Sequence, residues 1–290
     1  MTDSLNCFFV SDLHGKLDRY EKLFKQMMAE SPNALFIAGD ILPSPFAALT
    51  ALDIAHEDFI NGFLVKEFGK IKEDLGDKYP DVFVILGNDD GRMEEAALLD
   101  AAACGVWQYC HNRRIRWNEF SVYGYSYIPP TPFRLKDWER YDVSRYVDPG
   151  CISPEEGMRS IPVSEYQLKF GTIAEDLDKL VGEDNLEKSI FLFHSPPYKC
   201  KLDRAALDGK MIDYAPLDVH IGSIAIQRFI EEKQPLLTLH GHVHESTRLT
   251  GSWQDRFKRT ISFNAAHDGP ELSLVRFDPL RPEYATRELI

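Results

Sequence analysis

Five short apolar runs along the chain each end in a polar cluster that contains Asp, Asn or His. Runs of this length are short for helices and are typical of buried strands. They lie at 7–10, 34–38, 82–86, 189–193 and 236–239. The same criteria predict further strands at 120–126, 260–264 and 272–277.

Three stretches between these strands carry apolar residues at three- and four-residue steps, which predicts amphipathic helices. They are 17–30, 47–75 and 221–233. Strands that alternate with helices are typical of an α/β fold, and the strand-rich last third of the chain favours a second sheet.

Segment 124–165 does not follow this pattern, because it is rich in proline and aromatic residues and has weak periodicity. It is long for an ordinary loop, and long loops often serve as lids or binding segments. A packed surface excursion, anchored to the sheet by its aromatic residues, explains the same composition. Both interpretations stay open at this point.

The composition is that of an ordinary soluble globular protein, with 44% hydrophobic and 27% charged residues among 290. It excludes a disordered chain, a collagen-like fibre and a disulfide scaffold. Lys and Arg number 33 against 46 Asp and Glu, so the net charge is −13. This balance argues against an extended nucleic-acid or anionic-membrane surface. It does not exclude a phosphate ligand, because a bound metal can reverse the field locally.

The cysteines and the start of the chain indicate the compartment. The five cysteines contain no CxxC pair, as expected of buried or partly buried free thiols in a reducing environment. No apolar stretch reaches the roughly 18 residues of a membrane span. The first residues lack the basic and apolar regions of a signal peptide. We therefore expect a cytoplasmic protein with no membrane association.

Potential metal ligands directly follow the five apolar runs. Open α/β sheets build their sites at the carboxyl ends of strands, so these side chains are expected to meet in one cleft. In D-x-H and H-x-H the two ligands lie on the same side of an extended backbone. Carboxylate, amide and imidazole groups without a thiolate suit Mn, Fe, Zn or Ni. The candidates are Asp12, His14, Asp40, Asn88, His194, His242 and His244.

In this order the clusters resemble the five blocks of the calcineurin-like metallophosphoesterases, in particular their bacterial and archaeal members. The family blocks are D-x-H, G-D, G-N-H-[D/E], an isolated H and G-H-x-H, and the resemblance spans residues 7 to about 277. It implies an α/β fold that is a four-layer α/β/β/α sandwich, with two mixed sheets flanked by helices. It also implies a single domain over 1–290, with a candidate lid or insertion at about 124–165. The matching residues are Asp12-Leu13-His14, Gly39-Asp40, Gly87-Asn88-Asp89-Asp90, His194 and Gly241-His242-Val243-His244.

The resemblance further implies a phosphohydrolase with two metal ions, in which a metal-bridging hydroxide attacks a phosphomonoester or phosphodiester. Small phosphorylated molecules are the expected substrates, with a nucleotide as one candidate. A phosphoprotein phosphatase and a metal-binding scaffold for protein–protein contacts are the alternatives. One ion would be held by Asp12, His14, Asp40 and His244, and the other by Asp40, Asn88, His194 and His242, with Asp40 bridging the two.

One position departs from the family pattern, because the third block usually carries His after Asn and this chain has Asp89. That His is generally read as an acid for the leaving group or as a phosphate contact, which makes Asp89 the candidate catalytic residue. A carboxylic acid would donate a proton only if its pKa were raised, and nearby metals would lower it. A solvated loop carboxylate is the other interpretation. Asp90 fits the acidic fourth position, where it would orient a ligand by hydrogen bonding.

Contacts to the substrate are predicted from fewer residues. Arg134 could pair with a phosphate, while Tyr127 and Trp138 could stack on a base or anchor the segment to the sheet. His267 follows the predicted strand at 260–264 and could face the cleft. Asn88 would contact the substrate as well as a metal.

Overall fold

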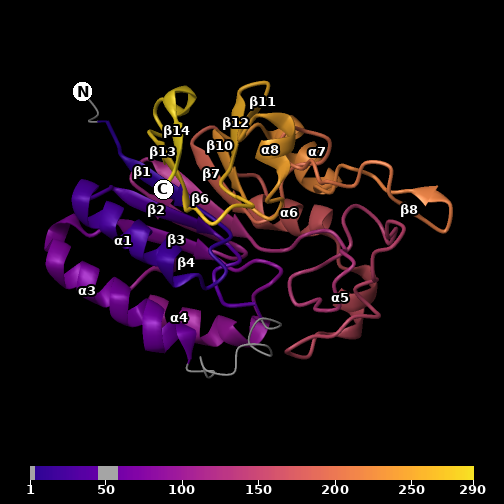
Figure 1. Ribbon diagram of the computed structural model, residues 1–290, viewed down its shortest axis with the longest axis horizontal. Helices are drawn as coiled ribbons and strands as arrows, with labels where there is room; N and C mark the ends of the chain where they lie inside the picture. Colours follow the sequence, from indigo (N-terminus) through magenta and orange to yellow (C-terminus); the bar gives the residue numbers. More distant parts are fainter. Residues whose placement is uncertain (1–3, 45–57) are drawn as a thin grey trace.

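Two six-stranded sheets form the centre of the computed structural model, which describes residues 4–44 and 58–290 (Figure 1). Each sheet contains four consecutive parallel strands. The remaining strands pair antiparallel, two on one side of the first sheet and one at each edge of the second. The first sheet has the order β14 (Thr286–Leu289), β13 (Ser273–Phe277), β1 (Cys7–Val10), β2 (Ala34–Ala38), β3 (Asp81–Ile85) and β4 (Gln108–Tyr109). The second has the order β11 (Gln254–Phe257), β12 (Thr260–Asn264), β10 (Leu237–His240), β7 (Ser189–Phe193), β6 (Phe120–Tyr125) and β5 (Arg113–Trp117).

Helices lie outside the two sheets, and a small hairpin projects from the second (Figure 1). The hairpin joins β8 (Met211–Ile212) to β9 (Ala215–Pro216). The helices are α1 (Leu17–Glu30), α3 (Val65–Leu75), α4 (Glu95–Ala103), α5 (Glu165–Phe170), α6 (Ile173–Val181), α7 (Ile224–Lys233) and α8 (Ser246–Thr250). Short helical turns are η1 (Ile60–Leu64), η2 (Gly76–Lys78), η3 (Arg92–Glu94) and η4 (Pro282–Tyr284).

The strands divide their side chains between two apolar layers, because successive residues of a strand point to opposite faces. In β1, Phe9 belongs to the cluster between the sheets and Phe8 to the cluster under the helices. The same alternation places Phe36 of β2 against Phe83 of β3, with ring centroids 5.0 Å apart. Both faces of these strands are buried, which explains their continuous apolar runs.

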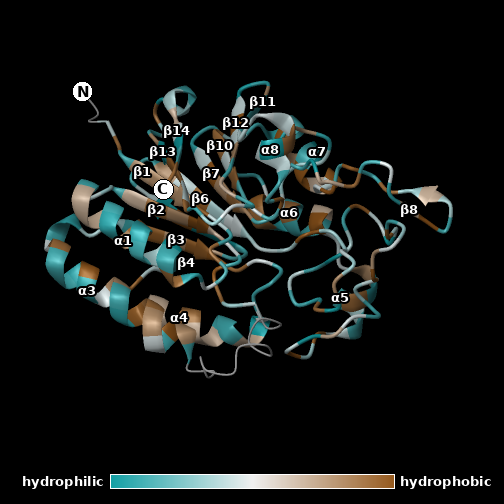
Figure 2. Cartoon of the chain, in the orientation of Figure 1, coloured by the Kyte–Doolittle hydropathy of each residue, from teal (hydrophilic) through white to brown (hydrophobic). Residues whose placement is uncertain are grey.

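The outer layers are amphipathic helices. Phe191 of β7 packs against Phe229 of α7, with ring centroids 5.1 Å apart, while Leu23 of α1 belongs to the same outer cluster. Figure 2 shows hydrophobic residues gathered along the central strands and a hydrophilic outer side of α1. This arrangement confirms the predicted four-layer α/β/β/α sandwich.

Several predicted elements differ in detail from the structure. Residues 47–57 of the predicted helix 47–75 lie outside the described residues, and the rest forms η1 and α3. The helix predicted at 221–233 begins only at Ile224, because the Ser223 hydroxyl caps it by accepting from the Ile226 N–H. Cys104 is exposed rather than buried or partly buried. Among the described residues, no helix is long and apolar enough to cross a membrane.

The segment between β6 and α5 (126–164) forms an irregular excursion that packs by its own side chains. Trp138 is fully buried and lies 4.8 Å from the ring of His111. Lys136 and Glu139 form a buried ion pair. The carboxylate of Asp137 accepts from the backbone N–H of Arg92 at 2.8 Å, which ties the excursion to the loop after β3. Aromatic residues therefore anchor this segment, as one of the two interpretations expected.

Candidate metal centre

Five parallel strands bring the predicted ligands to one edge of the two sheets. The loops after β1 and β2 are joined by backbone hydrogen bonds from Asp12 N to Gly39 O (3.0 Å) and from His14 N to Asp40 O (2.8 Å). In the second sheet, Gly241 N donates to His194 O at 3.0 Å. Main-chain contacts thus align neighbouring loops before any side chain is considered.

Four of the predicted ligands have a left-handed backbone. Their φ angles are 56° at Asp12, 48° at His14, 50° at Asp40 and 70° at His242. Non-glycine residues rarely adopt this conformation, and it costs of order 1–3 kcal/mol each. Such strain is found most often at functional sites, where it turns side chains in directions that regular structure does not allow.

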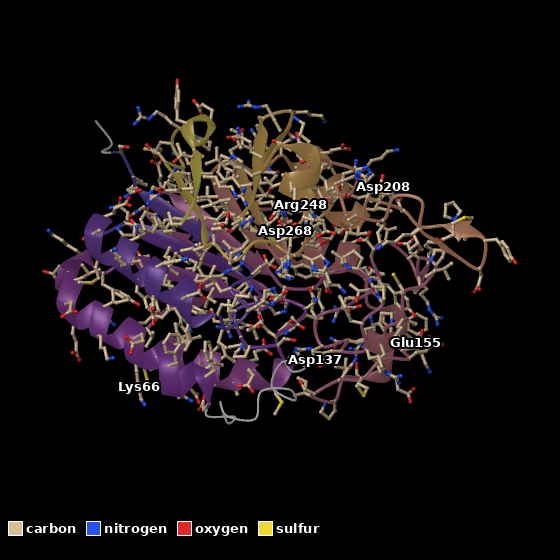
Figure 3. The ribbon with its side chains drawn as sticks, viewed as in Figure 1. Lys66, Asp137, Glu155, Asp208, Arg248 and Asp268 are labelled. Atoms are coloured by element: carbon tan, nitrogen blue, oxygen red, sulfur yellow. The ribbon has the colours of Figure 1, made fainter. Side chains whose placement is uncertain are left out.

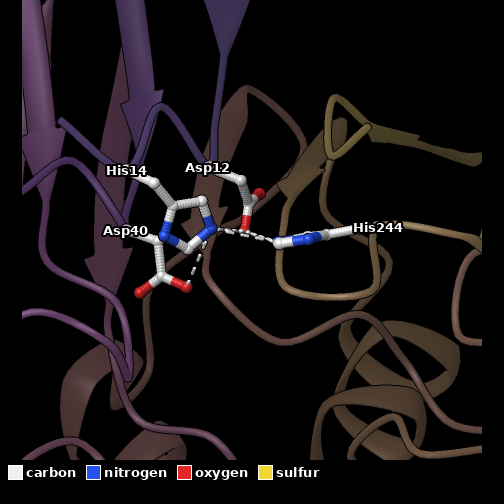
Figure 4. A group of neighbouring side chains, drawn as sticks. All are labelled: Asp12, His14, Asp40 and His244. Atoms are coloured by element: carbon white, nitrogen blue, oxygen red, sulfur yellow. Dashed lines mark hydrogen bonds and ion pairs between the residues drawn. The ribbon is translucent and has the colours of Figure 1, made fainter. Parts of the chain in front are cut away.

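One group of side chains is compact. One ligand atom from each of Asp12, His14, Asp40 and His244 lies within 4.8 Å of the others, as Figure 4 shows. Nε2 of His244 lies 3.0 Å from Oδ1 of Asp12 and 3.2 Å from Nε2 of His14. Nε2 of His14 is 3.9 Å from Oδ2 of Asp40.

A second group adjoins the first through Asp40. Oδ2 of Asp40 lies 3.2 Å from Nε2 of His194. The same nitrogen is 3.0 Å from Oδ1 of Asn88. The ring of His242 lies 5.3 Å from the His194 ring, centroid to centroid. The structure therefore brings all seven predicted ligands together, with Asp40 between the two groups.

The donor set fits a metal ion. When two nitrogens bind the same zinc or similar ion, each at about 2.1 Å, they lie about 3.0 Å apart at an octahedral angle and about 3.4 Å apart at a tetrahedral angle. The two Nε2 atoms of His14 and His244 are 3.2 Å apart. Oxygen and imidazole donors are also the ligands that Mn, Fe, Zn and Ni accept.

Burial and neighbouring charges shift the pKa values of the Asp and His side chains within the centre. Burial opposes ionisation of Asp40, but neighbouring His194 and His14 hold its pKa below the usual value. Burial likewise opposes protonation of His194, yet Asp40 and Asp12 raise its pKa to about 10. His242 differs, because burial and the nearby His194 lower its pKa to about 3. Within the described chain, the ion pairs of Asp12 and Asp40 are all with histidines.

Residues around the ligands hold them in place. Nδ1 of His194 lies 2.7 Å from the carbonyl oxygen of Ala38, so the N–H donates there and Nε2 faces the centre. Asp90 is buried and accepts from the backbone N–H groups of Leu42 and Gly87, each at 2.8 Å. It therefore clamps the loops after β2 and β3 together, and burial with nearby Asp40 raises its pKa to about 7.

Two glycines are required by close approach. A Cβ atom on Gly87 would lie 2.4 Å from Oδ1 of Asp40, and one on Gly241 would lie 2.5 Å from Oδ2 of Asp12. Real Cβ atoms do not come so near. The glycines that precede the ligands in the G-N and G-H blocks therefore give the carboxylates their space.

Arg19 was not predicted from the sequence. This buried α1 residue donates from Nη1 to the carbonyl of Asp12 and from Nη2 to the carbonyl of Gly269, both at 2.6 Å. It holds the first ligand loop from behind. The sequence signal that could have identified it is its spacing: Arg19 lies four positions before Leu23 and therefore on the apolar face of the helix.

The remaining predicted site residues lie outside the cluster. Nε2 of His267 is 2.9 Å from a carboxylate oxygen of Glu271. Arg134 is exposed, and its guanidinium makes no hydrogen bond or ion pair within the described chain. Asp89 stands closer, with a carboxylate oxygen 3.4 Å from Nδ1 of His14.

The loops that flank the centre are tied by polar pairs. Asn264 donates to the carbonyl of Val243 at 3.3 Å and thereby supports the G-H-x-H loop. Arg248 of α8 donates to Asp268 at 2.7 Å, and Figure 3 shows this pair side by side. These contacts join α8 to the loop after β12.

Comparisons with known proteins agree with this arrangement. Residues 5–246 match the calcineurin-like phosphoesterase family. Among solved structures, TT1561 of Thermus thermophilus is 17% identical, with a TM-score of 0.54 and 99% of each chain covered. A phosphopantetheinyl hydrolase from Mycobacterium tuberculosis is 11% identical, with a TM-score of 0.52 over 92% of this chain and 91% of the other. These likenesses show the fold alone. No curated protein matches the sequence.

The family match covers most of the chain and includes all five strand-end blocks. The donor set at those blocks is one that binds metal ions. The chain therefore belongs to the calcineurin-like phosphoesterase family and is a metal-dependent phosphoesterase.

Proposed function

We propose that the chain hydrolyses a phosphomonoester or phosphodiester of a small molecule with two metal ions bound at the strand ends. The convergence of Asp12, His14, Asp40 and His244 within 4.8 Å carries this proposal. The ligands come from both sheets and from residues 12 to 244, which supports treating 1–290 as one domain.

The proposed ligand sets share Asp40. When bound, the two ions polarise the phosphoryl group and make water a competent nucleophile near neutral pH. Asp40 suits the shared position because its Oδ1 accepts from the Asp89 N–H at 2.8 Å, while Oδ2 faces His194 and His14. We assign Asp12, His14, Asp40 and His244 to one ion and Asp40, Asn88, His194 and His242 to the other.

Contacts to the substrate form the finer part of the proposal. The Asn88 amide oxygen faces His194, so its amide nitrogen is left to donate to a phosphoryl oxygen. Arg134 is supported as an anion contact by its exposed guanidinium. His267 is less suited, because Glu271 already occupies Nε2.

A nucleotide has less support than the sequence suggested. Base stacking needs an exposed aromatic face, and Tyr127 and Trp138 are both buried. Phe133, beside Arg134, and Tyr146 are exposed aromatic side chains of the excursion. We propose a small phosphoester as the substrate, for which a base is not required.

A substrate panel tests the proposal. Protein stripped with a chelator is loaded with Mn, Fe, Zn or Ni and offered p-nitrophenyl phosphate, bis-p-nitrophenyl phosphate and a phosphoserine peptide. We expect metal-dependent release of p-nitrophenol from at least one of the first two. Cleavage of the peptide alone would favour a phosphoprotein phosphatase, and folded protein that cleaves none of the three would contradict the proposal.

A further inference from the structure

Asp89 touches two proposed ligands through different parts of the residue. Its backbone N–H donates to Oδ1 of Asp40 at 2.8 Å. One oxygen of its carboxylate lies 3.4 Å from Nδ1 of His14. Asp40 and His14 follow different strands, so Asp89 contacts two ligand loops. Main-chain hydrogen bonds align these loops but do not fix the orientation of the ligand side chains, which the contacts with Asp89 do.

The contact with Asp89 decides which nitrogen of His14 faces the centre. A neutral imidazole has one N–H and one lone pair. A carboxylate oxygen that faces a ring nitrogen accepts from its N–H, so the contact with Asp89 favours the tautomer with the proton on Nδ1. The lone pair then lies on Nε2, which is 3.2 Å from Nε2 of His244 and 3.9 Å from Oδ2 of Asp40.

His194 shows the same arrangement with a different partner. Its Nδ1 lies 2.7 Å from the carbonyl oxygen of Ala38, and its Nε2 faces Asp40. Imidazoles that bind metals are commonly fixed through their second nitrogen in this way. The main chain fixes His194, whereas His14 has the side chain of Asp89.

This geometry gives Asp89 a role other than proton donation. The oxygen that faces Nδ1 of His14 is not available to carry a proton to a leaving group. Its other described contact, the backbone N–H to Asp40, also orients a ligand. Both contacts are made with proposed metal ligands.

We propose that Asp89 is a positioning residue: its carboxylate accepts the Nδ1 proton of His14 and turns the Nε2 lone pair toward Asp12, Asp40 and His244. The inference rests on the proposed function, because it takes His14 as a metal ligand. It assigns to this chain a carboxylate support at the position where the resemblance expects a histidine.

Metal binding tests the proposal without relying on activity. The affinity of chelator-stripped protein for Mn²⁺ is measured by calorimetry for wild type, Asp89→Ala and Asp89→Asn. We expect one Mn²⁺ site to weaken about 10- to 100-fold in Asp89→Ala, the usual effect of losing such a support. Asp89→Asn keeps an acceptor oxygen and should lose less. Unchanged affinity in Asp89→Ala, or equal losses in both variants, would overturn the proposal.

Asp77→Ala is the matched control, because Asp77 is an exposed carboxylate in η2, at the opposite end of β3 from the centre. Its Mn²⁺ affinity should equal that of wild type. Urea unfolding of each variant checks that the protein is folded. If Asp89→Ala does not fold, Asp89→Asn carries the test. We then expect a measurable loss of Mn²⁺ affinity of less than about 10-fold, and an affinity equal to that of wild type would overturn the proposal.

Leaving-group dependence separates positioning from acid catalysis. At saturating Mn²⁺, Asp89→Ala should recover hydrolysis of aryl and alkyl phosphates in the same ratio as wild type. A selective loss of the alkyl ester, whose leaving group needs a proton, would identify Asp89 as the acid and overturn positioning. Wild-type protein that neither binds Mn²⁺ nor cleaves an ester would refute the proposed function itself. If wild type binds Mn²⁺ and cleaves an ester while Asp89→Ala keeps the wild-type affinity, only the role of Asp89 is refuted.

Discussion

The metal centre and the excursion at 126–164 both bury charged side chains, but they neutralise them differently. In the excursion, Lys136 and Glu139 are 0% and 1% exposed and pair with each other. In the centre, Asp12 and Asp40 are equally buried, and across the described chain only histidines form ion pairs with them. Buried charge needs a partner. In the excursion that partner is a lysine, whereas in the centre the described chain supplies only histidines, whose protons a bound cation would replace.

The largest effect should come from removing His194, a proposed ligand of one ion that also contacts Asp40, the proposed ligand of both ions. His194→Gln takes away the nitrogen that faces Asp40 and Asn88. Because the two ions act together on the phosphoryl group, we expect kcat/KM for an aryl phosphate to fall by about 10³-fold or more, or roughly 4 kcal/mol. Steady-state kinetics at fixed Mn²⁺ measures this.

His220→Gln is the control for that variant. His220 is also paired with a buried carboxylate, since its Nδ1 lies 2.8 Å from Asp203, but it contacts none of the described ligands. Its kcat/KM should stay within about threefold of wild type, well under 1 kcal/mol. A loss comparable to that of His194→Gln would mean that the centre extends beyond the strand-end blocks.

Breaking the ion pair of the excursion should damage stability instead of chemistry. Lys136→Met leaves Glu139 buried without its cation, although Thr131 N still donates to it at 2.7 Å. Such a change costs about 3–5 kcal/mol in the free energy of unfolding. Urea unfolding measures the loss, and the folded fraction should bind as much Mn²⁺ as wild type. A loss of bound metal without a loss of stability would erase the contrast between the two regions.

The smallest effect concerns how stability depends on pH through His111, whose ring packs against Trp138 of the excursion. Burial, with nearby Arg92 and Arg140, lowers the pKa of His111 to about 3. The unfolded chain takes up this proton near pH 6.5, so stability is full above that pH and is lost as pH falls toward 3. Between pH 7 and 5 the loss from this group is about 2 kcal/mol. Urea unfolding should show a shallower pH dependence in His111→Gln, and identical slopes would argue against a neutral buried imidazole.

The sequence was most informative where local patterns and chemistry coincide. The run at 7–10 and the ligands that follow it were predicted together, because a buried parallel strand is apolar on both faces and its carboxyl end is where sites form. The edge strand β5 was missed since its sequence, Arg113–Trp117, is mostly polar. Edge strands have fewer neighbours and need less apolar surface.

The excursion could not be predicted in the same way. Its backbone contacts are isolated bridges such as Ile128 with Glu139, so no periodicity reports them. The partner of Asp137 is the backbone N–H of Arg92, which is remote in sequence and carries no side-chain signal. Figure 3 shows Asp137 and Glu155 on this part of the molecule. Arg19 was missed for the same reason, because its acceptors are main-chain carbonyls.

The most direct test of the central claim is the number of metal ions bound by Asp40→Asn. After Mn²⁺ loading and removal of free metal, elemental analysis should find about two ions per wild-type chain and a marked loss in the variant. Asp208→Ala, which removes an exposed carboxylate paired with Arg204, should retain the wild-type number. An Asp40→Asn protein with unchanged stoichiometry would contradict the shared position of Asp40, and with it the proposed two-metal centre.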